Sequence, residues 1–115
     1  MKNFRDHINS YRYGINGIAI GFRLERNMSL HLVGAVGVIL MNIVLEVTQT
    51  EWLITLMLIG MVLTAEFFNT AIERLSDRVT FKEDPLIRQV KDLASGAVLI
   101  TCVLAVACAS IIYLF

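Results

Sequence analysis

A stripe of polar residues lies at the end of the second long apolar stretch, in the segment AEFFNTAIERLSDRVT (residues 65–80). Its members are Glu66, Asn69, Glu73 and Asp77. On an α-helix of 3.6 residues per turn they fall within an arc of about 80° and rise roughly 16 Å along the axis. Because an ionisable group at bilayer depth costs about 3 kcal/mol, such a stripe in a membrane helix indicates a functional site.

The acids of this stripe suit two kinds of chemistry. Glu66 has apolar neighbours on both sides, and desolvation favours the protonated carboxyl, the direction that a general base near neutral pH requires. Glu73 lies closer to water, where its hard oxygen atoms suit Mg²⁺, and Glu25 in the polar segment RLERNMSL is the expected second ligand. Glu73 and Asp77 could instead pair with arginines and only hold the helices together.

Two further charged residues begin the last apolar stretch at the same membrane face. Lys91 and Asp92 lie in the segment VKDLASG, and a lysine there either anchors the helix or holds a phosphate as a point charge. A base on the lipid side, with carboxylates and a lysine on the water side, suits phosphoryl transfer from a soluble nucleotide to a lipid hydroxyl. Neither GxxxxGK[ST] nor GxGxxG occurs, so these residues alone do not identify the phosphate donor.

The chain is too apolar for a soluble domain of its size. Of its 115 residues, 57% are hydrophobic and 17% are charged, and the mean hydropathy is +0.68. Three stretches can cross about 30 Å of hydrocarbon, namely residues 28–47, 52–71 and 93–115. All ten basic residues lie within 2–26 and 74–91, so the positive-inside rule places the N-terminus and the 74–91 loop in the cytoplasm.

The first 25 residues predict an amphipathic helix and a hinge. Apolar residues recur there at helical spacing: Phe4, Ile8, Tyr11, Ile15, Ile18 and Phe22. We expect this helix to lie in the cytoplasmic interface, and Gly14, Gly17 and Gly21 indicate a close approach of a backbone or a ligand. Pro85 should end the helix of the second span, with a new helix beginning near Leu86. The fold class is therefore an all-α membrane protein, one compact domain over residues 1–115.

The polar motifs resemble those of a known family. EFFNTAIERLSDRVT followed by KDLASGAVLI, with ERN upstream and three spans, is similar to the small prokaryotic integral-membrane lipid kinases, the diacylglycerol kinase and undecaprenol kinase family. The resemblance extends from about Tyr11 onward. It implies a homotrimer in a bacterial cytoplasmic membrane, with active sites shared between neighbouring subunits, and ATP-dependent phosphorylation of a membrane lipid alcohol. No nucleic-acid partner is expected.

The resemblance also implies roles for individual residues. Glu66 matches the catalytic base, and Glu25 and Glu73 match the carboxylates that bind the Mg²⁺ of the nucleotide. Ser95 matches a position near the lipid. The remaining matches are polar or nucleotide-contacting positions of the active site: Tyr13, Asn69, Asp77, Lys82, Glu83, Asp84, Lys91 and Asp92.

Some positions depart from the diacylglycerol branch of this family. Asp6 aligns with an arginine of that branch, and His31 stands where that branch has a carboxylate. The hinge ERNMSLHL and the loop with Pro85 look more like the undecaprenol branch, so undecaprenol is favoured as substrate, with diacylglycerol as the alternative. A non-catalytic oligomeric subunit, such as a proton-conducting bundle, is a remote alternative, because the polar residues gather at one membrane face and Asn42 is the clear exception.

Overall fold

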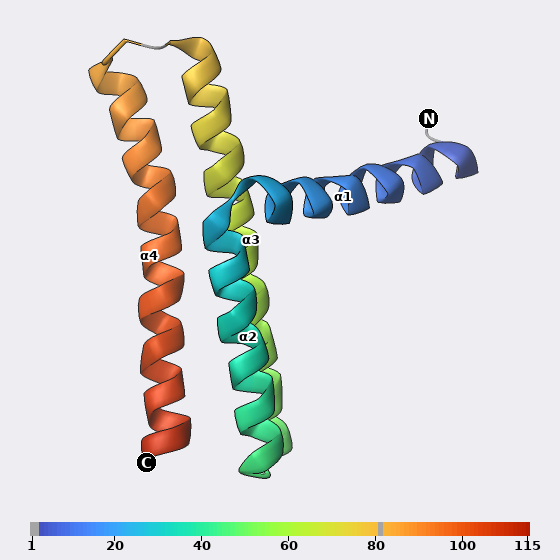
Figure 1. Ribbon diagram of the computed structural model, residues 1–115, viewed down its shortest axis with the longest axis vertical. Helices are drawn as coiled ribbons and strands as arrows, with labels where there is room; N and C mark the ends of the chain where they lie inside the picture. The colour runs from blue at the N-terminus through green and yellow to red at the C-terminus, as the bar shows by residue number, and fades with distance from the viewer. Residues whose placement is uncertain (1–2, 81) are drawn as a thin grey trace.

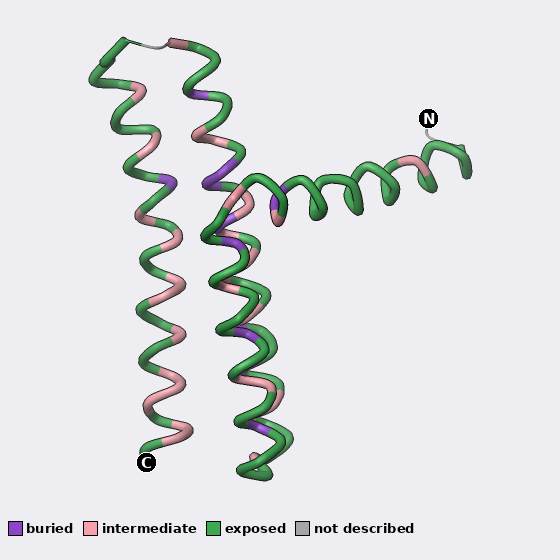
Figure 2. Tube along the Cα trace, in the orientation of Figure 1, coloured by how far each residue is buried: buried purple, intermediate pink, exposed green. Residues whose placement is uncertain are grey.

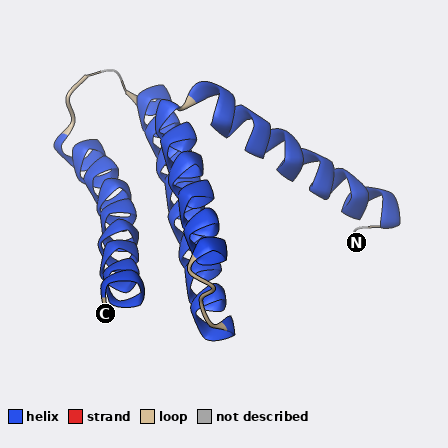
Figure 3. Cartoon of the chain, turned by 60° about the horizontal axis from the view of Figure 1, so that its bottom comes forward, coloured by secondary structure: helices blue, strands red, loops and turns tan. Residues whose placement is uncertain are grey.

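The computed structural model describes residues 3–80 and 82–115, and this part of the chain folds into helices with no strand. The helices are α1 (Phe4–Leu24), α2 (Arg26–Val44), α3 (Gln49–Val79) and α4 (Pro85–Leu114). In Figure 1, α2, α3 and α4 run side by side, while α1 leaves the bundle crosswise; Figure 3 shows the same arrangement from another side. The predicted all-α fold is confirmed.

Local sequence signals determine where these helices begin. Asn3 and Asp6 form a capping box at the start of α1, with the Asn3 side chain accepting the Asp6 backbone N–H at 3.0 Å. Thr48 and Glu51 form the equivalent capping box at the start of α3. At α4 the Asp84 carboxylate accepts the backbone N–H groups of the second and third helical residues, and proline occupies the first position. Asp6 and Asp84 therefore each have a structural role.

Three helices are long and apolar enough to cross a membrane, as predicted. Helices α2, α3 and α4 have stretches of mean hydropathy 1.7, 1.7 and 2.6. At 1.5 Å per residue, the 31 residues of α3 extend about 46 Å, well beyond the hydrocarbon thickness. The helix continues past the predicted span end at Ala71 to Val79, so the whole polar stripe lies on one unbroken helix.

Few side chains are buried within the single chain. The buried hydrophobic residues are Met28, Ala35, Leu58 and Ala94, and Ala94 is the one described residue of α4 that is buried. Figure 2 shows the buried positions along α2 and α3, with most of the surface exposed. Because lipid tails solvate apolar side chains as well as a protein core does, this exposure fits a multi-pass membrane protein.

At the end of the bundle where the C-terminus lies, a hydrogen-bonded bridge joins α2, α3 and α4. Asn42 donates its side-chain N–H to the Thr55 hydroxyl at 2.8 Å, and its side-chain oxygen accepts the Tyr113 hydroxyl. Asn42 is 1% exposed. Asn42 was singled out in the sequence, but its two partners were not.

The last turns of α1 pack against α3, and the rest of α1 projects from the bundle. Phe22 and Phe67 make an edge-to-face contact with ring centroids 5.8 Å apart. A Cβ on Gly21 would overlap the Phe67 ring, whereas Gly14 and Gly17 have no described atom within 4 Å of an added Cβ. The expected approach of a backbone or a ligand is not found: at Gly21 the close neighbour is the side-chain ring of Phe67, and this contact places α1 at the level of Phe67.

Candidate functional site

The polar stripe runs along α3 from a buried to an exposed environment. Glu66 is 4% exposed and Asn69 is also buried, whereas Glu73 is half-buried and Asp77 is exposed. Glu66 lies next to Phe67, at the level of α1, and α3 continues past that level in Figure 1. Glu73 and Asp77 are about 10 and 16 Å farther along the axis. The structure thus orders the groups along the helix as the sequence predicts.

Glu66 pairs with His31, which stood out in the sequence only because the diacylglycerol branch has a carboxylate at that position. Its Oε2 lies 3.3 Å from His31 Nε2, across the contact between α3 and α2. Side-chain exposure is 6% for Glu66 and 24% for His31. A hydrogen-bonded partner lowers the cost of keeping this carboxylate out of water.

Asn69 lies between Glu66 and Glu73 on α3 and contacts the second of them. Its side-chain N–H group donates to Glu73 Oε1 at 3.4 Å. Its Oδ1 is buried and has no hydrogen-bond partner among the described residues. Buried acceptors are normally paired, so this oxygen, one turn from Glu66, is available to a hydroxyl group or a water molecule.

Lys91 of α4 is brought to the exposed end of the stripe, as predicted. Its ammonium group forms an ion pair with the Asp77 carboxylate of α3. Near the same end of α4, Arg88 and Asp92 form an exposed pair at 3.2 Å, one turn apart. The ion pair between Lys91 and Asp77 joins the start of α4 to the end of α3.

A polar pocket of about 640 Å³ lies between the end of α3 and the start of α4. It gathers five residues that were predicted to contact the nucleotide: Asp77, Lys82, Glu83, Asp84 and Lys91. Arg88 also lines it and was not predicted. Its position three residues before Lys91 on a helix, and hence on the same face, is the signal that could have identified it.

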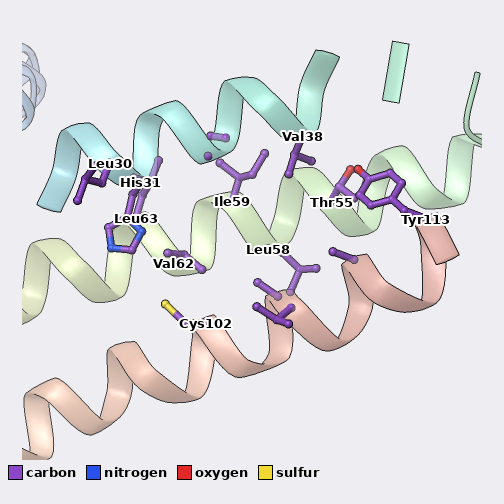
Figure 4. A pocket seen from close by; sticks show the side chains of 15 residues that line it. Leu30, His31, Val38, Thr55, Leu58, Ile59, Val62, Leu63, Cys102 and Tyr113 are labelled. Carbon is purple, nitrogen blue, oxygen red and sulfur yellow. The ribbon is translucent and has the colours of Figure 1, made fainter. Parts of the chain in front are cut away.

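An apolar cavity of about 310 Å³ lies between α2, α3 and α4. His31 lies at one end, and Thr55 and Tyr113 lie at the other (Figure 4). Small residues on α2 and α4, among them Gly34 and Ala105, line it. This cavity was not predictable from the sequence, because its walls come from three separate helices.

The remaining predicted residues are not brought together within one chain. Tyr13 is 71% exposed on α1, and Ser95 is exposed on α4. Glu25 is half-buried at the hinge, and its side chain makes no capping hydrogen bond. Among residues 3–80 and 82–115, no group of three or more His, Cys, Asp or Glu side chains could hold a metal ion.

Glu25 and Glu73 still have the donor chemistry that Mg²⁺ prefers. Mg²⁺ in nucleotide sites is commonly held by one or two carboxylates, with phosphate oxygens and water completing the octahedron. Both side chains are half-buried, with access to water. Each carboxylate therefore has the chemistry of a ligand to the metal of a nucleotide, although the described residues form no metal site by themselves.

Comparison with known proteins identifies the family. Residues 12–113 match the prokaryotic diacylglycerol kinase family. The chain belongs to that family. This confirms the predicted resemblance, and the family match includes every predicted site residue from Tyr13 to Ser95, whereas Asp6 lies outside it.

Two members of this family with assigned activities are similar to the chain. The undecaprenol kinase of Bacillus subtilis is 38% identical over 109 residues, which cover 91% of this chain and 86% of that protein. The diacylglycerol kinase of Synechocystis sp. is 30% identical over 98 residues, which cover 84% of this chain and 56% of that protein. The chain therefore spans most of the first relative and just over half of the second.

Proposed function

We propose that this protein is a lipid kinase that uses Mg²⁺ and ATP to phosphorylate a membrane lipid alcohol. One observation carries the proposal: in a chain of this family, a buried acid, Glu66, lies on the same face of α3 as Glu73 and Asp77, and Asp77 pairs with Lys91 of α4. Undecaprenol is the favoured acceptor, because the relative named for it is the more similar and is covered almost throughout. Diacylglycerol is the alternative, supported by the second relative.

The proposed orientation has the N-terminus and the loop between α3 and α4 in the cytoplasm of a bacterial cell, with the helices in the cytoplasmic membrane. The distribution of basic residues supports this topology. The crosswise direction of α1 and its exposed apolar residues support a position in the membrane interface. Glu66 would then lie at the inner edge of the hydrocarbon, and the polar pocket would lie in water.

In the proposed reaction the lipid approaches from the bilayer and the nucleotide from the cytoplasm. The apolar cavity, with His31 at its inner end, offers room for the part of the lipid chain nearest the hydroxyl. Glu66 accepts the hydroxyl proton as the lipid oxygen bonds to the γ-phosphorus, and ADP leaves with the electrons of the broken P–O bond. The unpartnered oxygen of Asn69 is a suitable acceptor for orienting the hydroxyl or a water.

The nucleotide would occupy the exposed half of the site. Lys91, Lys82 and Arg88 supply positive charge around the polar pocket for the phosphates. Asp92 beside Arg88, together with Glu83 and Asp84 in the loop, would make the remaining polar contacts. Glu25 and Glu73 would hold the Mg²⁺ of the nucleotide, which would supply charge neutralisation for the transferred group.

A homotrimer would complete this site. Tyr13 and Glu25 are not among the residues that line the polar pocket of their own chain, and one side of α4 exposes apolar residues such as Leu99 and Val103. Helices of neighbouring subunits could cover that surface and bring residues of α1 to the nucleotide. The trimer is supported by the sequence resemblance and by this unoccupied surface.

The test is a lipid phosphorylation assay with purified protein in bilayers, Mg²⁺ and labelled ATP, offering undecaprenol or diacylglycerol. The proposal expects label in both lipids, with the higher rate on undecaprenol. A higher rate on diacylglycerol would assign the chain to the diacylglycerol branch of the family. No labelled lipid with either alcohol would refute the kinase proposal and favour the non-catalytic alternative.

A further inference from the structure

The contact between His31 and Glu66 has a geometry suited to orienting a base. His31 Nε2 lies 3.3 Å from one carboxylate oxygen, Oε2. Among the hydrogen bonds of the described residues, this is the one made by the Glu66 side chain. The second oxygen, Oε1, is therefore left for another donor.

His31 lies on the face of α2 that is turned towards α3. Met28, three residues before it, is fully buried, and Ala35, four residues after it, is also buried. Positions at this spacing share one side of a helix, so the backbone of His31 is held by packing on both sides. A hydrogen bond from a side chain so placed fixes its partner in one orientation.

No lysine or arginine among the described residues makes a hydrogen bond or an ion pair with Glu66. Lys91 pairs with Asp77, and Arg88 pairs with Asp92. The described titratable residues that share the apolar cavity with His31 are Cys102 and Tyr113 of α4, and the Tyr113 hydroxyl donates to Asn42. Within the described part of the chain, the imidazole is the group that contacts the Glu66 carboxylate at hydrogen-bond distance.

We propose that His31 is a positioning residue of the lipid kinase reaction, an inference that rests on the proposed function. Its Nε2–H donates to Oε2 of Glu66 and keeps the carboxylate from turning towards the surrounding apolar side chains. Oε1 then faces the lipid hydroxyl and takes its proton as the oxygen–phosphorus bond forms and the bond to ADP breaks. His31 retains its own proton throughout this step.

The test compares His31→Leu and His31→Gln with the same substitutions at His7, an exposed residue of α1. A hydrogen bond to a charged group is worth enough for His31→Leu to lower kcat about 10- to 100-fold. The KM for ATP should stay unchanged, because the polar pocket is formed by the far ends of α3 and α4. His31→Gln should recover most of the rate, since its amide N–H can donate, and both His7 variants should be fully active.

A second comparison separates positioning from a merely structural role. Glu66→Asp withdraws the carboxylate by one methylene group, so His31→Leu should cost less kcat in that background than in the unsubstituted protein. Equal costs in both backgrounds, unchanged kcat in His31→Leu, or a raised KM for ATP would overturn the inference. Absence of lipid phosphorylation by the unsubstituted protein would refute the proposed function itself.

Discussion

Removing the Tyr113 hydroxyl tests the hydrogen-bonded bridge between α2, α3 and α4. In Tyr113→Phe, the side-chain oxygen of Asn42 loses its donor, although Asn42 still donates to Thr55. Interhelical hydrogen bonds in membrane proteins average about 0.6 kcal/mol and reach about 1.7. Because Asn42 is almost completely buried, its unpaired oxygen finds no water, and we expect a loss of stability of about 1–2 kcal/mol.

A double-mutant cycle gives this prediction its control. Asn42→Leu keeps a similar volume and removes the acceptor, so Tyr113→Phe should cost almost nothing in that background. Thr55 remains satisfied in both backgrounds, since its hydroxyl also donates to backbone oxygens of the preceding turn.

Unfolding by titration with a denaturing detergent in mixed micelles measures both costs. Trp52, the chain's single tryptophan, lies one turn before Thr55 on α3, and its fluorescence reports on this end of the bundle. An unchanged unfolding midpoint in Tyr113→Phe, or the same loss in the Asn42→Leu background, would refute the bridge as a stabilising element.

Three other predictions concern the site and the helix that reaches it. Gly21→Ala should lower thermal stability and kinase activity, because the added Cβ would overlap the Phe67 ring. Adding Phe67→Leu to this variant should restore part of the stability and part of the activity. A Gly21→Ala protein as stable as the unsubstituted protein would contradict this packing. Lys91→Met should raise the KM for ATP about 10-fold, because a charged contact with the nucleotide is lost. Initial rates measure this change, and an unchanged KM would show that Lys91 does not bind the nucleotide. A chelator of Mg²⁺ should abolish lipid phosphorylation, and full activity in its presence would refute the metal assignment. Glu73→Gln should raise the Mg²⁺ concentration that gives the half-maximal rate about 10-fold.

Features that depend on local sequence were predictable. The order of groups along the stripe follows from helical geometry alone, so Glu66 was expected to be the most buried acid, and it is. The break before Pro85 was predicted because proline tolerates only the first turn of a helix, where it is found. The level of Lys91 followed from its place at the start of the last apolar stretch.

Features that depend on contacts between distant segments were not predictable. His31 and Glu66 are 35 residues apart, and Asn42 and Tyr113 are 71 apart. Such pairs depend on the rotation of each helix about its axis, which apolar composition does not determine when lipid and protein solvate the same side chains equally well.

The rate of lipid phosphorylation by Glu66→Gln, in bilayers and with saturating Mg²⁺ and ATP, tests the central claim most directly. Glutamine keeps the size of the side chain and can still contact His31, but it accepts no proton. A loss of about 10²- to 10⁴-fold is expected for removal of a general base, with helical content and oligomeric state unchanged. A turnover rate near that of the unsubstituted protein would show that Glu66 is not the base and would contradict the account.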